Sequence, residues 1–129
     1  MRERVAQSPV GRLATVTRDG RPHVVPCCFA LVGATIYSAV DRKPKSTLAL
    51  RRLENIRAHP HASLLVDHYA DDWSTLWWVR VDGPAVLVED PTVRGHAISE
   101  LRAKYPQYRT TPPPGPVLAI AIESWRGWP

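Results

Sequence analysis

Apolar and polar positions alternate with the period of a β-strand over most of the chain. The segment 12–32 contains two apolar runs joined at Asp19-Gly20, a dipeptide that is typical of a β-hairpin turn. Pro26 cannot donate a hydrogen bond to a neighbouring strand, so its strand is expected at an edge, a bulge or an opening of the sheet. The same alternation predicts further strands at 34–40, 61–69, 76–90 and 117–128.

Two segments carry helical periodicity instead. In the first, 46–60, Ser46 or Thr47 can cap the start and Pro60 ends the helix. Its apolar positions recur near helical spacing at Leu48, Ala49, Leu53 and Ile56. The second, 90–105, begins with Asp90 as cap and Pro91 in the first turn. The proline-rich segment 110–116 predicts a stiff, extended connector before the last strand.

These elements predict one mainly β domain over residues 1–129. Six strands with short connections and two interposed helices indicate a small closed β-barrel with helices packed on it. Gly83-Pro84 marks a bulge or bend in the long fifth strand. At 129 residues the chain is large enough for one core and too small for two.

Composition also bears on the expected cellular location and on the kind of partner. No apolar run approaches the 18 or so residues of a membrane helix, and residues 1–11 lack the apolar core of a signal peptide. We therefore expect a cytoplasmic protein. The net charge of +5 suits an anionic partner, although a basic surface that only maintains solubility explains it equally well. Adjacent Cys27 and Cys28 point to opposite faces of an extended segment, which favours two reduced thiols.

The basic charges gather at the start of the first helix, at Arg42, Lys43, Lys45, Arg51 and Arg52. Backbone N–H groups at a helix N-terminus carry partial positive charge, so lysines just before it can form a phosphate or carboxylate site. A solvated run of charges without a ligand remains equally compatible with the spacing.

Several other kinds of site are not indicated. The scattered glycines form neither a dinucleotide fingerprint nor a P-loop, and no serine has the context of a hydrolase nucleophile. His59, His61 and His68 are interpreted as surface or helix-end residues rather than metal ligands. Asp71 and Asp72 are interpreted as a solvated turn.

Five tryptophans stand out, three of them within six positions. Core packing explains at least two, but a strand places Trp77 and Trp78 on opposite faces, so one of them is expected in a groove or at a subunit interface. Aromatic residues on a basic barrel also suit single-stranded nucleic acid. Acidic residues interrupt any basic track, however, and make that partner the weaker hypothesis.

Three segments resemble the pyridoxamine 5'-phosphate oxidase-like split β-barrel superfamily: GRLATVTRDGRPHVVPCCF, KPKSTLALRRLENIRAHPHASLLVD and DDWSTLWWVRVDGPAVL. Within it, they are most similar to the flavin/deazaflavin oxidoreductases that use coenzyme F420. The resemblance covers roughly residues 8–90. It implies an FMN-binding-like split barrel, a homodimer, and two cofactor sites in grooves between the subunits.

The resemblance also implies a set of cofactor-binding residues. Val25, Pro26 and Cys27 would face the flavin or deazaflavin ring, with Ser38 beside the groove. Lys43, Lys45, Ser46, Arg52 and Asn55 fall in the segment that holds the phosphate and the acidic tail of F420. Trp73, Trp77 and Trp78 fall where the second subunit closes over the cofactor, and Trp125 and Arg126 are candidates for the far wall.

Two departures from the family bear on these assignments. The longer loop and helix leave Lys43/Lys45 and Arg51/Arg52 as alternatives for the phosphate contact, and the last strand stops soon after Trp128, which argues against pyridoxamine phosphate as substrate. The function implied is F420-dependent hydride transfer to an unidentified small molecule. The alternatives are an FMN-dependent oxidoreductase or a non-enzymatic cofactor carrier. Catalytic residues of the chain itself are not indicated.

Overall fold

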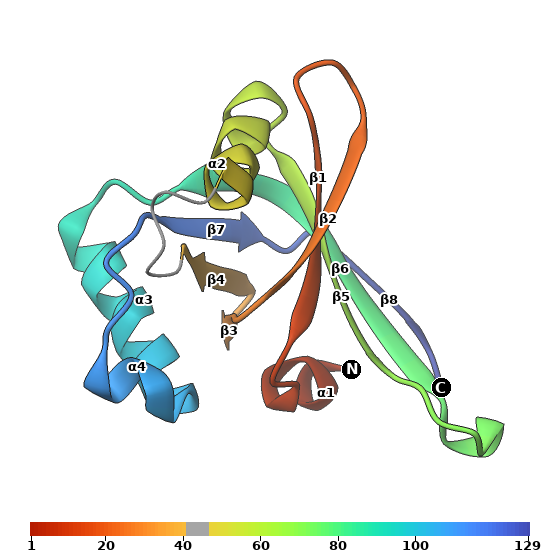
Figure 1. Ribbon diagram of the computed structural model, residues 1–129. Coiled ribbons are helices and arrows are strands. Elements are labelled where there is room, and N and C mark those ends of the chain that lie inside the picture. Colours follow the sequence, from red (N-terminus) through yellow and green to blue (C-terminus); the bar gives the residue numbers. More distant parts are fainter. Residues whose placement is uncertain (41–46) are drawn as a thin grey trace.

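The computed structural model describes residues 1–40 and 47–129, and for 47–50 only the backbone. Its centre is one antiparallel sheet with the strand order β2-β1-β5-β6-β7-β4-β3, in which β8 also pairs with β6 (Figure 1). The strands are β1 Gly11–Val16, β2 Pro22–Cys27, β3 Ala30–Val32, β4 Thr35–Ala39, β5 His61–His68, β6 Trp77–Leu87, β7 Val117–Ala121 and β8 Ser124–Trp128. The mainly β prediction is confirmed.

Two parts of the predicted barrel are wrong. The described residues form eight strands rather than six, because the second and the last apolar run each break: β2 ends at Cys27 before β3 begins, and β7 ends at Ala121 before β8 begins. The barrel is also not closed, since β2 and β3 end the strand order and do not pair with each other. The edge position expected from Pro26 is thus found in β2.

Strand β6 turns a corner at Gly83. Its first part pairs with β5 and β8, and from Ala85 onward it pairs with β7. A Cβ atom added at Gly83 would lie 1.9 Å from the carbonyl oxygen of Ala121, so only glycine allows the two backbones to approach this closely. The bend predicted at Gly83 therefore marks where β6 changes partners.

Both predicted helices are confirmed, as α2 Thr47–Ala58 and α3 Pro91–Lys104. Helix α3 begins as expected, with the Asp90 carboxylate accepting a hydrogen bond from the Thr92 N–H at 2.8 Å. The short helices α1 Arg2–Gln7, α4 Pro106–Thr110 and the 3₁₀ turn η1 Trp73–Thr75 were not expected. They are too short to show a helical period. No helix among the described residues is long and apolar enough to cross a bilayer.

The core lies in two adjoining clusters of buried side chains. The main cluster fills the concave side of the sheet around Leu13, Phe29, Leu64 and Ile120. The second packs Leu101 and Ala97 of α3 and Tyr108 of α4 against Val117. In Figure 1, α3 and α4 lie together on one side, while β5, β6 and β8 extend away on the other. The free ends of β5, β6 and β8 therefore lie away from α3 and α4.

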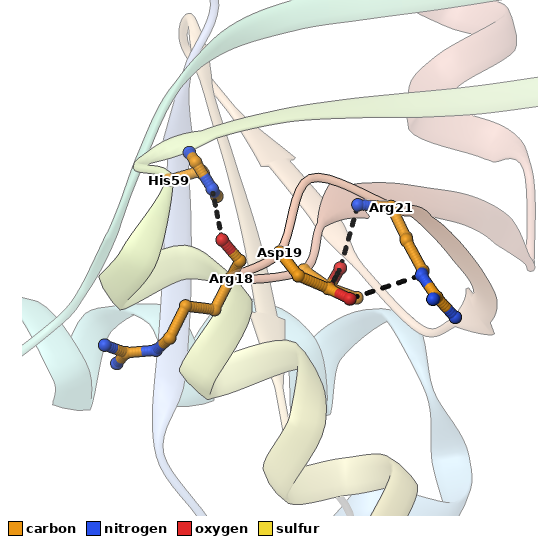
Figure 2. A network of polar contacts seen from close by, with 5 residues as sticks. Arg18, Asp19, Arg21 and His59 are labelled. Carbon is orange, nitrogen blue, oxygen red and sulfur yellow. Dashed lines mark hydrogen bonds and ion pairs between the residues drawn. The ribbon is translucent and has the colours of Figure 1, made fainter.

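The β1–β2 turn is held by polar contacts at the start of the hairpin (Figure 2). The side chains of Asp19 and Arg21 form an ion pair at 3.2 Å, and the His59 ring lies 3.4 Å from the Arg18 carbonyl oxygen. Gly20 has φ 87°, as the predicted turn requires. His59 thus serves to join the end of α2 to this turn.

Candidate cofactor site

Three of the expected site residues meet beside α2. Cys27, at the end of β2, is buried and interacts with the hydroxyl of Ser38 from β4 and with the charge of Arg52 from α2. Burial raises the pKa of the Cys27 thiol, an effect that the Ser38 hydrogen bond and the Arg52 charge partly offset. Ser38 also donates to the Cys28 carbonyl oxygen at 2.7 Å. The thiol at this position is therefore neutral at ordinary pH.

Two nitrogen atoms on this side of the sheet lack partners. The Nε atom of Arg52 and the Nδ1 atom of His23 are both buried, and neither has a hydrogen-bond partner among the described residues. His23 lies on β2 opposite Thr15 of β1. An unpaired buried donor is costly, so a guanidinium N–H without an acceptor is a ready contact for an anionic group. The donors present on this side of α2 thus fit a phosphate or carboxylate.

Asn55 is buried inside the fold, whereas a residue that only contacts a ligand would be open to the site. Its side chain is 3% exposed, and its Nδ2 atom donates to the Thr15 hydroxyl at 3.0 Å. This buried pair fixes the position of α2 against β1. Asn55 therefore holds the helix that carries Arg52.

The β2 residues that were expected to face one ring lie on two faces. Val25 and Cys27 point toward the main core cluster, whereas Pro26 between them is exposed. Lys43, Lys45 and Ser46 lie outside the described residues. The structure thus brings together Cys27, Ser38 and Arg52, places Val25 on the same face of β2 as Cys27, and leaves Pro26 on the opposite face.

The tryptophans lie in η1 and along β6 and β8, apart from the Arg52 cluster. Trp77 and Trp125 are half-buried against the main core, with the guanidinium groups of Arg4 and Arg2 from α1 lying 4.8 and 5.9 Å from their ring centroids. Trp77 also stacks on His68, with the ring centroids 6.4 Å apart. Helix α1 therefore covers this pair.

The other face of the same strands carries a groove. Trp78 of β6 is paired in register with Trp128 of β8, and Arg126 is paired with Arg80. The groove has a volume of about 550 Å³, and its lining includes Leu65, Tyr69, Leu76, Trp78, Arg80 and Trp128. Trp77 and His68 also line it, so the groove reaches the stacked pair of rings. Trp73 is 69% exposed in η1 and does not line it. Within one chain, the groove and the Arg52 cluster lie on different parts of the molecule.

His23 is the residue that sequence reasoning missed. It belongs to the same alternation as Val25 and Cys27, so the period of two along β2 could have placed it on their face. What the period could not show is that its Nδ1 atom is buried without a partner. Across the described part of the chain, no group of three or more metal-ligating side chains is close enough to hold a metal ion.

Comparison with solved structures supports this fold. The chain is similar to a conserved hypothetical protein from Mycobacterium tuberculosis, with 24% identity over 98% of this chain and 80% of that chain and a TM-score of 0.79. A FAD-binding protein from Mesorhizobium loti shares 28% identity over 98% of this chain and 89% of that one, with a TM-score of 0.72.

A heme binding protein from Mycobacterium smegmatis has the same fold, with a TM-score of 0.78 and 19% identity over 98% of this chain. The chain spans only 51% of that protein. No curated protein gives a match. The family model described as pyridoxamine 5'-phosphate oxidase matches residues 1–129, in agreement with the split-barrel resemblance. The chain therefore belongs to the pyridoxamine 5'-phosphate oxidase family.

Proposed function

We propose that the protein binds coenzyme F420 beside α2 and transfers a hydride between it and a small molecule. The observation that carries this proposal is the Nε atom of Arg52, which is buried and has no partner among the described residues. An anionic cofactor would supply the missing acceptor. The family relation and the basic net charge of +5 support an anionic, flavin-like cofactor.

The chain's own residues bind and position rather than react. Arg52 holds an anionic group of the cofactor, and the Asn55–Thr15 hydrogen bond keeps α2 and thus Arg52 in place. Val25 and the neutral thiol of Cys27 form an apolar wall that excludes water from this side. Bound F420 would supply the hydride, because the cofactor carries the redox chemistry.

FMN is the alternative cofactor, and a non-enzymatic carrier is the alternative role. FMN has a phosphate but no polyglutamate tail, so it needs fewer positive charges than F420. The FAD-binding and heme-binding neighbours make a cofactor carrier of this fold a reasonable second candidate.

We further propose that two copies associate through the groove on the outer face of β5, β6 and β8. This face combines exposed aromatic surface at Trp128 with charges of both signs, Asp67 and Arg80, which suits a self-complementary contact.

A titration of the purified protein with F420 and, separately, with FMN tests the cofactor, with tryptophan quenching as the readout. We expect Arg52→Met to weaken F420 binding by about tenfold or more, because a charge-assisted hydrogen bond is lost. Arg57→Met is the matched control, since Arg57 lies on the same helix but is exposed. It should bind F420 as the unaltered protein does.

Three outcomes would count against the proposal. If FMN bound more tightly than F420, FMN would be the cofactor. If the Arg52 and Arg57 variants lost F420 affinity equally, Arg52 would not be the residue that binds the anionic group. Tight F420 binding without turnover of any electrophile in a substrate panel would favour the carrier.

A further inference from the structure

The two adjacent cysteines face different parts of the molecule. Cys27 is 7% exposed and belongs to the main core, whereas Cys28 is half-buried and packs against the second cluster beneath α3. They lie where the strand breaks between β2 and β3. Only Cys28 is thus partly open to solvent.

Cys28 lies in the wall of a second cavity. This cavity has a volume of about 510 Å³ and is lined by Pro9, Cys28, Tyr105, Gln107, Tyr108, Thr111 and Pro113. Its size is in the range of small-molecule sites. Neither Arg52 nor any tryptophan lines it, so it is separate from the proposed cofactor site.

A buried ammonium group accompanies the thiol. The Nζ atom of Lys104, at the end of α3, is buried and has no hydrogen-bond partner among the described residues. It lies 3.7 Å from the ring centroid of Phe29, the residue after Cys28. Cys28 and Cys27 are the titratable groups whose thiolate forms would attract the Lys104 ammonium. A thiolate at Cys28 would therefore provide the counter-charge that this ammonium lacks.

Tyr105 completes the cluster. Its hydroxyl accepts from the Phe29 N–H at 3.0 Å, lies 2.9 Å from the Pro9 carbonyl oxygen, and interacts with the Cys28 side chain. Burial raises the pKa of Tyr105 to about 12, so the hydroxyl stays neutral and does not compete with the thiol for the charge of Lys104. The cluster thus holds one partly exposed nucleophile, one cation and one neutral donor.

We propose that Cys28 is a thiol-modification site that takes a small organic disulfide into this cavity and forms a mixed disulfide with one half of it. The Cys28 thiolate attacks one sulfur of the disulfide, the S–S bond of the small molecule breaks, and a new S–S bond forms to Cys28. Cys28 is oxidised, and the departing half is reduced to a thiolate that takes a proton from water. The small disulfide is the oxidant, and no other reactant is required.

The reaction of the folded protein with oxidised glutathione tests this site. Adduct formation is followed by intact mass, and the adduct is located by peptide mapping. We expect one rapid adduct, on Cys28, which Cys28→Ser abolishes and Cys27→Ser retains. Lys104→Met should slow it about three- to tenfold, because the buried cation that stabilises negative charge on the attacking sulfur is removed. Arg18→Met, which removes one charge from the exposed β1–β2 turn, should not slow it.

A comparison in urea needs no variant. The folded protein should react at Cys28 faster than the unfolded chain does at the same residue, even though the thiol is half-buried in the folded state. A rapid adduct on Cys27, a folded rate at or below the unfolded rate, or an unchanged rate in Lys104→Met would each overturn the proposal. Circular dichroism of each variant shows that the rates refer to folded protein.

Discussion

Each of the two proposed sites contains a buried side-chain nitrogen atom without a hydrogen-bond partner among the described residues. These atoms are Arg52 Nε and Lys104 Nζ, and the charges of both side chains act on Cys27. A desolvated cation without a counter-charge lowers stability, so each of these two cations is expected to gain a negatively charged partner. For Arg52 the proposed partner is a cofactor anion, and for Lys104 it is a thiolate of the chain itself.

Lys104 predicts a pH dependence of stability. Burial lowers its pKa from 10.5 to about 8, so between these values the unfolded chain binds more protons at this residue than the folded chain does. The contribution of Lys104 to the free energy of unfolding should therefore rise as pH increases from about 8 toward 10.5. Urea unfolding of the wild type and of Lys104→Met across this interval measures it.

The difference between the two proteins cancels the contribution of Tyr105, and that of Cys27 apart from the minor effect that Lys104 has on the Cys27 thiol. The raised pKa values of Cys27 and Tyr105 act in the opposite direction, since stability is lost as each group ionises first in the unfolded chain. A difference curve that stays flat or falls over this interval would contradict the burial of the Lys104 ammonium.

Strand β6 shows how one element joins the two parts of the fold. It pairs with β5 and β8 along its first part and with β7 along its last part, and the change falls at Gly83. The carbonyl of Ala121 occupies the space that a side chain would need. The geometry of this strand therefore depends on one residue without a Cβ atom.

Substitution of Gly83 in β6 should lower the stability of the protein. Gly83→Ala should lower the free energy of unfolding by about 3 kcal/mol, because the new methyl group meets backbone atoms that cannot move aside. Gly95→Ala is the matched control: nothing lies within 4 Å of its added Cβ, and the site is within α3. It should raise stability by about 1 kcal/mol. Denaturant unfolding of both variants decides whether the corner at β6 needs glycine, and equal effects would show that it does not.

At the scale of the whole molecule, the sheet has a covered and an uncovered side. The concave side is filled by the main core and closed at one end by α1, whose arginines lie over Trp77 and Trp125. The outer side of β5, β6 and β8 presents the aromatic groove instead, with Trp128 51% exposed. An aromatic surface of this kind is typical of a binding face.

The proposed dimer predicts that this groove controls association. We expect the protein to sediment as a dimer and Trp128→Glu to shift it toward the monomer, because a buried carboxylate would be left unpaired at the contact. Val86→Glu serves as control, since Val86 is 57% exposed on β6 and does not line the groove. A wild-type monomer, or dissociation by both variants alike, would refute this interface.

The local elements could be predicted from the sequence because short-range physics forms them. The hairpin at Asp19-Gly20 follows from a turn that needs a positive φ, and α3 follows from the Asp90 cap and its proline. The same holds for α2 and for most of the strands, whose periods are visible along the chain. The Arg52, Cys27 and Ser38 positions came from the family resemblance rather than from any period.

By itself, then, the sequence determined the strands, the two long helices and the basic character of the protein. Only the tertiary structure decided where two strands break, that β2 and β3 remain unpaired with each other, and that Pro26 faces away from Cys27. It also showed that Arg52, His23 and Lys104 hold buried nitrogen atoms without partners among the described residues. The physical reason is that periodicity records which face a residue occupies, whereas burial and pairing depend on elements distant in the chain.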